Sequence, residues 1–451
     1  MAQKRKYGRQ LNATRTIALV FFCIIVLGTL LLMLPFASRS GESQGVLTAL
    51  FTATSATCVT GLNMGDTYTM WSGFGQTVIL CLIEVGGLGF MSAAAVVVFM
   101  LRKKVSLRQR MVMAQALSVS DMDGIVRLQK WVLGGSILIQ LSGALVLFIR
   151  FLPEYGALTA AKWGVFHSVS AFCNAGFDIF GKIDPGQSVA MFQSDPVVLI
   201  TLMALVVLGG LGFFVWEEVA TVRSWKKYSV YTKLVLLTTA ILLLAGAGLI
   251  LLLEWNNPKT LGAMSVGDKL LNGFFQSVTM RTAGFASFDQ GAMTDGGKVV
   301  SILLMVTGGS SGSTAGGVKT VTVMVVVLFL ISRLRSRSNV SVFRRNVPQS
   351  KILDAMTILM MVAGLAMLGS LVICTTSGVG FTDALYEAVS ALATVGVTTG
   401  ITPELSVISK LMIIVFMYFG RVGILTISLG FLMGDRAQER YRYADTNLLI
   451  G

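Results

Sequence analysis

The chain has 451 residues, of which 54% are hydrophobic and only 13% are charged. Soluble domains carry about 25% charged residues, so this composition excludes an ordinary soluble protein and predicts an all-α protein that crosses a membrane several times. The net charge of +14 could indicate nucleic-acid binding. The basic residues lie between long apolar runs instead, so we expect the lipid bilayer and not nucleic acid as a partner.

The basic residues form clusters at the two ends of the chain and between the apolar runs. These clusters occupy residues 4–15, 102–110, 223–233, 333–351 and 436–442. Loops rich in Lys and Arg stay on the cytoplasmic side of a membrane. We therefore expect both termini and three inter-repeat loops to be cytoplasmic.

A short motif recurs four times along the chain and ends each time on a glycine. These repeat glycines are Gly61, Gly176, Gly284 and Gly396, and they follow one another in steps of 108 to 115 residues. Each follows an apolar segment of about a dozen residues, whereas a helix needs roughly 20 residues to span a membrane. The spacing predicts four repeats, each made of a spanning helix, a half-helix, an extended loop and a second spanning helix.

In chain order, the predicted repeats are separated by cytoplasmic segments. Repeat one (16–104) has helices at 16–34 and 74–101 around a half-helix at 46–57. Repeat two (131–222) has a helix at 131–151, a half-helix at 160–172 and a second helix that begins at Pro196. Repeat three (231–333) has a helix at 231–253, a half-helix at 268–280 and an interrupted helix at 298–331, and repeat four (352–434) has helices at 352–374 and 406–433 around a half-helix at 381–394. The cytoplasmic segments are the basic tail 1–15, the loops 105–130, 223–230 and 334–351, and the tail 435–451. The predicted fold has eight transmembrane helices in four helix–pore-loop–helix repeats around one pseudo-four-fold pore.

Extended backbone inside a membrane must be buried in protein or must line a water-filled cavity. Four such loops satisfy this requirement together if they meet around one axis, where their carbonyls replace the hydration shell of a cation. The pattern predicts backbone ligands at Thr60, Gly61, Ala175, Gly176, Ala283, Gly284, Val395 and Gly396. No arrangement of residues typical of an enzyme active site is visible, so we expect a transport protein and no enzyme.

These glycines, the run from Gly308 to Gly317 and Arg421 together resemble the Trk/Ktr/HKT superfamily of potassium transporters. The resemblance covers about residues 15 to 434 and is greatest to the Ktr-type (KtrB-like) membrane subunits, because only about fifteen residues precede the first predicted helix. It implies K+ transport, with the ion at Gly61, Gly176, Gly284 and Gly396. A serine at the first of these positions accompanies sodium preference in some relatives, so Gly61 favours K+.

The resemblance also implies an assembly. It indicates a homodimer in the bacterial plasma membrane with one pore in each subunit. Regulation would come from a cytosolic ring of nucleotide-binding RCK-type (KtrA-like) subunits, and uptake would depend on Na+ as an activating or coupling ion. No organic cofactor is expected in this chain.

The glycine-rich run lies in the middle of an apolar segment. It consists of Gly308, Gly309, Ser310, Ser311, Gly312, Ser313, Thr314, Ala315, Gly316 and Gly317. A phosphate-binding loop is disfavoured because Val318 breaks the pattern G-x-x-x-x-G-K-[ST] and no strand precedes it, and a flexible linker would not interrupt an apolar span. The resemblance implies an intramembrane gate below the ion site, with Arg421 facing the pore and interacting with the loop.

Other polar residues are open to two interpretations. Glu84 is either a structural hydrogen-bonding group or part of the ion path, and Asp66, Asp178 and Asp289 either concentrate cations at the outer mouth or are ordinary loop acids. Arg281 is expected to anchor a half-helix, and His167 to pack. The alternatives for the whole chain are a Trk-type or Na+-permeable transporter and, from another class, a membrane scaffold or enzyme with basic docking loops.

Overall fold

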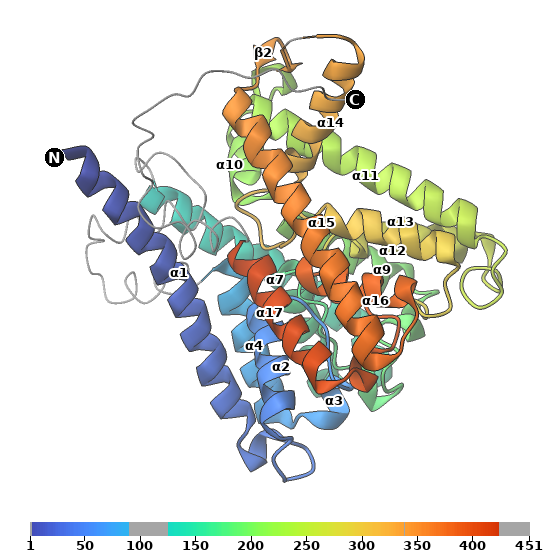
Figure 1. Cartoon of the computed structure of the whole chain (residues 1–451). Coiled ribbons are helices and arrows are strands. Elements are labelled where there is room, and N and C mark those ends of the chain that lie inside the picture. Colours follow the sequence, from blue (N-terminus) through green and yellow to red (C-terminus); the bar gives the residue numbers. More distant parts are fainter. Residues whose placement is uncertain (1, 90–124, 338, 424–451) are drawn as a thin grey trace.

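The computed structural model describes residues 2–89, 125–337 and 339–423 (Figure 1). In these ranges the chain is helical apart from its loops and one small hairpin, in agreement with the predicted all-α class. The predicted end of repeat one, most of the 105–130 loop, the end of repeat four and the 435–451 tail lie outside the described residues. The short elements are η1 (Pro35–Ala37), α3 (Thr67–Met70), η2 (Phe180–Lys182), η3 (Ala190–Phe192), η4 (Trp225–Lys227), β1 (Ser341–Val342), β2 (Arg345–Asn346) and η5 (Thr402–Glu404).

Four long helices of the described ranges are apolar enough to cross a membrane. They are α1 (Ala2–Leu32), α7 (Ile125–Tyr155), α11 (Val230–Glu254) and α15 (Gln349–Ser377), with mean hydropathies of 2.2 to 2.6 over their apolar segments. Leu138, Leu244 and Leu371 on these helices are at least 60% exposed, as side chains that face lipid are. Each long helix begins one of the four predicted repeats.

Four shorter helices follow the long ones and point their ends into the centre of the protein. These half-helices are α2 (Val46–Thr57), α8 (Ala157–Phe172), α12 (Val266–Thr279) and α16 (Phe381–Leu392). Each packs against the long helix before it, and their last turns are buried. Phe51, Phe172, Phe275 and Leu392 are at most 2% exposed, so the half-helices form the core.

Within the described residues, the second helix of every repeat ends early or is interrupted. The helices are α4 (Gly73–Leu88), α9 (Pro196–Leu211) followed by α10 (Phe213–Thr221), α13 (Asp295–Val306) followed by α14 (Thr320–Leu334), and α17 (Val407–Val422). The prediction of continuous helices at 74–101 and 406–433 is therefore wrong. The helices end at Gly89, Gly212 and Gly423, whose φ angles of 81°, 94° and 96° are left-handed, and α10 leaves α9 at an angle of 94°.

A second set of glycines, three residues before these breaks, brings each second helix against a half-helix. A Cβ on Gly86, Gly209 or Gly420 would lie 2.0, 1.9 or 2.3 Å from a backbone carbonyl oxygen. Those oxygens belong to Thr57, Phe172 and Leu392, the last residues of α2, α8 and α16. No residue with a side chain fits such an approach, so glycine fixes where α2, α8 and α16 end.

Replacing Gly209 by Ala tests this contact. The added methyl group meets rigid backbone, and overpacking of this kind costs about 1–3 kcal/mol, which exceeds the gain of about 1 kcal/mol in helix propensity. We expect Gly209→Ala to lower the melting temperature of the purified protein in detergent. Gly248→Ala is the matched control, because Gly248 lies in α11 with no atom within 4 Å of the new Cβ, and this variant should melt at or above the wild-type temperature.

Candidate functional site

After each half-helix the backbone adopts the same rare conformation. The residues two positions before the repeat glycines are Val59, Asn174, Thr282 and Thr394, and their φ angles lie between 51° and 65°. The repeat glycines themselves have φ angles from 67° to 101°. Positive φ is uncommon for residues other than glycine, and it is most costly for β-branched ones such as Val59, Thr282 and Thr394. Strain of this kind persists only where the surrounding structure enforces it, and it gathers at functional sites.

The four loops close into a ring in the order of the repeats. Each repeat glycine faces a carbonyl oxygen of the neighbouring repeat. The distance from the position that a Cβ on the glycine would take to that oxygen is 2.5 Å for Gly61 to Ala175, 2.8 Å for Gly176 to Ala283, 2.7 Å for Gly284 to Val395 and 1.9 Å for Gly396 to Thr60. All eight predicted ligand residues thus meet at one place. The contact pattern is cyclic, as expected for a pseudo-four-fold axis.

The amide groups of the ring are held from behind. The N–H groups of Thr60, Ala175, Ala283 and Val395 donate to half-helix carbonyls at 2.8–2.9 Å. Ser390 illustrates the side-chain contribution, because its Oγ accepts from Gly396 N at 3.1 Å and donates to the Val397 carbonyl at 2.6 Å. Ser170 and Thr279 donate in the same way to the carbonyls of Phe177 and Phe285.

The carbonyls of the ring have no such partners. Within the described ranges no hydrogen bond reaches the carbonyl oxygens of the four repeat glycines or of the residues just before them. Buried carbonyls without a partner are rare in proteins. A ring of them, built only from oxygen atoms, can replace the water around a desolvated monovalent cation.

The glycine-rich loop reaches this ring from one side. Thr314 Oγ1 donates to the Phe172 carbonyl at 3.0 Å and to Asn174 Oδ1 at 3.1 Å. A Cβ on Gly316 would lie 1.9 Å from Thr394 Oγ1. The loop therefore touches two of the four positions that precede the ring, on the side of the half-helix ends.

Backbone hydrogen bonds hold the loop at both its ends and along its length. Gly308 N donates to Val318 O at 2.9 Å, and Thr320 N donates to Gly309 O at 3.1 Å. Ser310 N and Thr314 N donate to the carbonyls of Gly210 and Gly209 on α9. Further contacts of the loop are Tyr231 OH to Ser311 O, Phe213 N to Gly312 O, Ser313 Oγ to Ser310 O, Ser310 Oγ with Thr320 Oγ1, Lys319 Nζ to Ala315 O, and Gly317 against Ala393 O.

Arg421 joins the loop to repeat one. Its Nη1 donates to the Thr314 carbonyl, and its Nη2 donates to the carbonyls of Gly86 and, at 2.9 Å, Gly87. The contact between Arg421 and the loop that the resemblance implies is thus present. Because these partners are neutral carbonyls, the guanidinium keeps its full positive charge beside the loop.

Repeat three differs from the others by one residue, and that residue introduces a buried cation. Met280 caps α12 four residues before Gly284, whereas the caps of the other half-helices lie three residues before their glycines. The additional residue makes room for Arg281, whose side chain is buried and only 7% exposed. Its Nη2 lies 3.4 Å from the Gly308 carbonyl and 3.5 Å from Thr239 Oγ1, which agrees with the expected anchoring role.

Glu84 and His167 are both engaged in the protein interior. Glu84 accepts from Gln140 Nε2 at 3.0 Å and from Cys173 Sγ at 3.4 Å, contacts of the kind that the structural interpretation predicts. His167 stacks on Phe180 at 3.7 Å, and its two ring nitrogens bond to Trp163 O and Ile179 N. It packs as expected.

Two of the three predicted outer acids come together. Asp66 Oδ1 caps α3, and Asp66 Oδ2 accepts from Gly186 N in the loop after α8. Asp178 lies in that loop, outside the spanning helices, where burial and then the Asp66 carboxylate raise its pKa to about 7. Asp289 instead accepts from Gly291 N at 2.8 Å in its own loop.

The similarity of this chain to known proteins agrees with this geometry. The model of the TrkH family, described as a cation transport protein, matches residues 2–440. The chain belongs to the TrkH family. Members of this family are membrane transport proteins and not enzymes.

Two characterised relatives and one solved structure illustrate the membership. The potassium/sodium uptake protein NtpJ of Enterococcus hirae is 38% identical over 99% of both chains. The Ktr system potassium uptake protein B of Bacillus subtilis is 39% identical over 97% of this chain and 96% of its own. The crystal structure of the potassium transporter TrkH from Vibrio parahaemolyticus superimposes with a TM-score of 0.71 at 17% identity, covering 93% of this chain and 84% of that one, so the chain has the TrkH fold.

Sequence reasoning missed several residues that touch the glycine-rich loop. Asn174, Lys319 and Tyr231 all bond to it, and only Asn174 lies in a motif that the repeat had singled out. An Asn two positions before a repeat glycine, where the other repeats have Val or Thr, was the available signal for Asn174. Nothing local marked Tyr231, because its contact spans 80 residues.

Proposed function

We propose that this chain is the K+-translocating subunit of a Ktr-type uptake system, with eight transmembrane helices in four repeats around one pore. The observation that carries this proposal is the ring of carbonyl oxygens without hydrogen-bond partners around the four repeat glycines. The ring is the selectivity filter of the proposal. Its ligands are the carbonyls of Thr60, Gly61, Ala175, Gly176, Ala283, Gly284, Val395 and Gly396.

Selection follows from the way in which the filter is built. A dehydrated cation needs several oxygen ligands at once, and neutral carbonyls hold K+ without the strong retention that a carboxylate would cause. The half-helices also direct their partly negative C-terminal ends toward the filter. Serine and threonine hydroxyls behind the loops keep the spacing of the carbonyls fixed.

The glycine-rich loop is the gate of this proposal. It lies against Asn174 and Thr394, which directly precede the filter, and Arg421 adds a positive charge beside it. Both features oppose the passage of a cation while the loop is in place. Opening then requires that the loop leave these contacts.

The names of the relatives support the proposed partners. One relative is part of a Ktr system, which favours cytosolic RCK-type regulatory subunits, and another is a potassium/sodium uptake protein, which favours Na+ as an activating or coupling ion. The proposed homodimer, the bacterial plasma membrane and the cytoplasmic termini follow the resemblance and the basic clusters. Figure 1 shows α10 and the β hairpin at one end of the protein, and the neighbouring basic clusters support a cytoplasmic location for this end.

Cation uptake into proteoliposomes that hold this subunit tests the function. We expect K+ to enter in preference to Na+. Equal or Na+-favoured uptake would support the Na+-permeable alternative. The absence of cation uptake in the presence of the regulatory ring would contradict the transport function.

Gly284→Ser tests the filter. A side chain at residue 284 lies 2.7 Å from the Val395 carbonyl and 2.8 Å from the Gly176 Cα, so it distorts the carbonyl ring. We expect the K+ concentration for half-maximal uptake to rise about tenfold or more. Gly378→Ser is the matched control, because Gly378 also has a left-handed φ of 67° but no atom lies near the new side chain. Unchanged K+ affinity in the Gly284 variant would exclude the ring as the K+ site.

Deletion of residues 309–316 tests the gate. We expect the folded variant to take up K+ faster than the wild type, because the contacts with Asn174 and Thr394 are removed. Arg421→Met should act in the same direction, since it removes the bonds to Thr314, Gly86 and Gly87. Slower uptake by variants that elute as folded protein would show that the loop assists conduction instead.

The proposal predicts that K+ uptake depends on pH through Asp178. Its pKa of about 7 means that the carboxyl is charged above pH 7, where it attracts cations to the outer mouth, and neutral below pH 7. We expect the K+ concentration for half-maximal uptake to rise about threefold as the external pH falls from about 8 to about 6. Asp178→Asn should show the weaker affinity at both pH values. Asp184→Asn, on an exposed residue of the same loop, should keep the wild-type dependence.

A further inference from the structure

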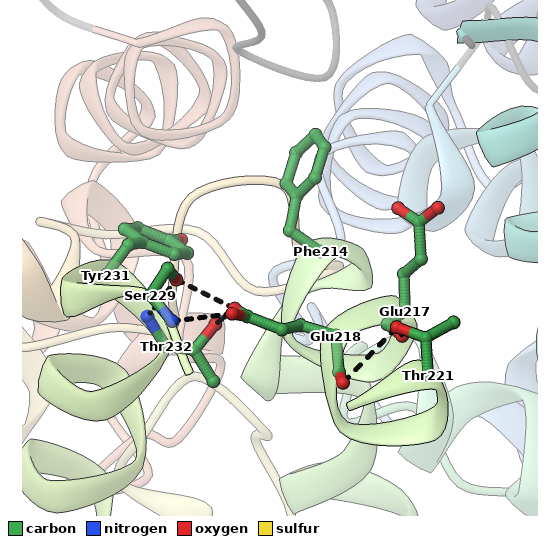
Figure 2. A pocket seen from close by; sticks show the side chains of 7 residues that line it. All are labelled: Phe214, Glu217, Glu218, Thr221, Ser229, Tyr231 and Thr232. Carbon is green, nitrogen blue, oxygen red and sulfur yellow. Dashed lines mark hydrogen bonds between the residues drawn. The ribbon is translucent and has the colours of Figure 1, made fainter. Parts of the chain in front are cut away.

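A cavity of about 420 Å³ lies between α10 and the start of α11, on the face that the basic residues assign to the cytoplasm. Its lining residues are Phe214, Glu217, Glu218, Thr221, Ser229, Tyr231 and Thr232 (Figure 2). This volume is within the usual range for small-molecule sites. Neither the filter nor the gate loop accounts for it.

The two acids of the cavity differ in their surroundings. Glu218 accepts hydrogen bonds from Ser229 N, from Ser229 Oγ at 2.7 Å and from Thr232 Oγ1. These bonds join α10 to the first turn of α11. Figure 2 shows Glu218 turned toward these residues, whereas Glu217 and Phe214 rise from α10 on another side. Among the described residues the Glu217 carboxylate forms no ion pair.

One wall of the cavity holds the gate loop. Tyr231 OH donates to the Ser311 carbonyl at 2.9 Å, and Phe213 N, at the start of α10, donates to the Gly312 carbonyl at 2.8 Å. Both acceptors lie at the turn of the loop, away from the filter. The loop is thus fastened to the same two helices that form the cavity.

The charged groups among the lining residues are carboxylates, which favour a cation. An anion would meet two carboxylates, whereas a guanidinium group can pair with Glu217 and lie against the rings of Phe214 and Tyr231. A guanidinium group held between Glu217 on α10 and the Tyr231 ring on α11 would compete with the contact between the Tyr231 hydroxyl and the Ser311 carbonyl.

We propose that this cavity is a control site that binds an arginine side chain of a cytosolic partner, and that Tyr231 is the latch through which binding releases the gate loop. This inference rests on the proposed gating role of the loop. It adds the site at which control enters and the residue that transmits it. Tyr231 acts through the loop and is a positioning residue.

The latch is tested first with Tyr231→Phe in proteoliposomes. The variant keeps the ring and loses the hydroxyl, and one hydrogen bond corresponds to about a two- to tenfold change in the closed-to-open ratio. We expect K+ uptake without any partner to rise by that factor at unchanged K+-over-Na+ preference and melting temperature. Tyr228→Phe is the matched control, because Tyr228 lies three residues earlier and packs on Trp225, and its uptake should stay at the wild-type rate.

The site is tested with N-acetyl-arginine amide, which carries a single guanidinium, on the cytoplasmic side at about 10 mM, since one such contact gives roughly millimolar affinity. We expect it to raise wild-type uptake, and to have no effect on Glu217→Gln or Tyr231→Phe. N-acetyl-citrulline amide, its uncharged counterpart, should be inactive on all three. A response that persists in Glu217→Gln, or an equal response to the citrulline compound, would overturn the site.

The deletion of residues 309–316 separates this inference from the proposed function. If the deletion raises uptake and Tyr231→Phe does not, the loop is a gate and Tyr231 is not its latch. If neither changes uptake, the gating proposal itself is wrong. If the wild type takes up no K+ at all, the transport proposal fails before either question arises.

Discussion

The contact between the end of a half-helix and a glycine of the following helix is the constraint on which the rest of the structure depends. The last carbonyls of α2, α8 and α16 lie so close to Gly86, Gly209 and Gly420 that no side chain fits between them. This contact stops these three half-helices in the interior of the protein. The chain must then continue as extended backbone, and its left-handed residues carry the following carbonyls to the common axis.

Repeat three departs from this scheme in two places that are related. Its half-helix is followed by one additional residue, and its second helix opens into the loop between α13 and α14. In this repeat Gly308 meets Gly316 of the loop itself, where the other repeats have a half-helix carbonyl. Arg281 fills the space and reaches the Gly308 carbonyl. The departure from symmetry therefore places the glycine-rich loop next to the carbonyl ring, which is the arrangement that the proposed gate requires.

The elements that could be predicted from the sequence are those with local signals. The recurring glycines and the short apolar segments located α2 to the residue and the other half-helices to within three residues. The breaks at Gly89, Gly212 and Gly423 were missed, because an isolated glycine in a helix costs only about 1 kcal/mol and tertiary contacts decide whether the helix ends. The bond from Thr314 to Asn174 joins residues 140 apart, so no local pattern could reveal it.

The loop contacts have an energetic consequence for regulation. Each hydrogen bond contributes about 0.5–1.5 kcal/mol net, so the bonds that join the loop to Asn174, Arg421, Tyr231 and Phe213 together amount to a few kcal/mol. Shifting a two-state equilibrium from 1:99 to 99:1 takes about 5.5 kcal/mol. In the proposed gating mechanism, a loop held by several individually weak bonds can be released by the binding energy of one partner. Its contacts with both the carbonyl ring side and the α10–α11 side connect the two sites of that proposal.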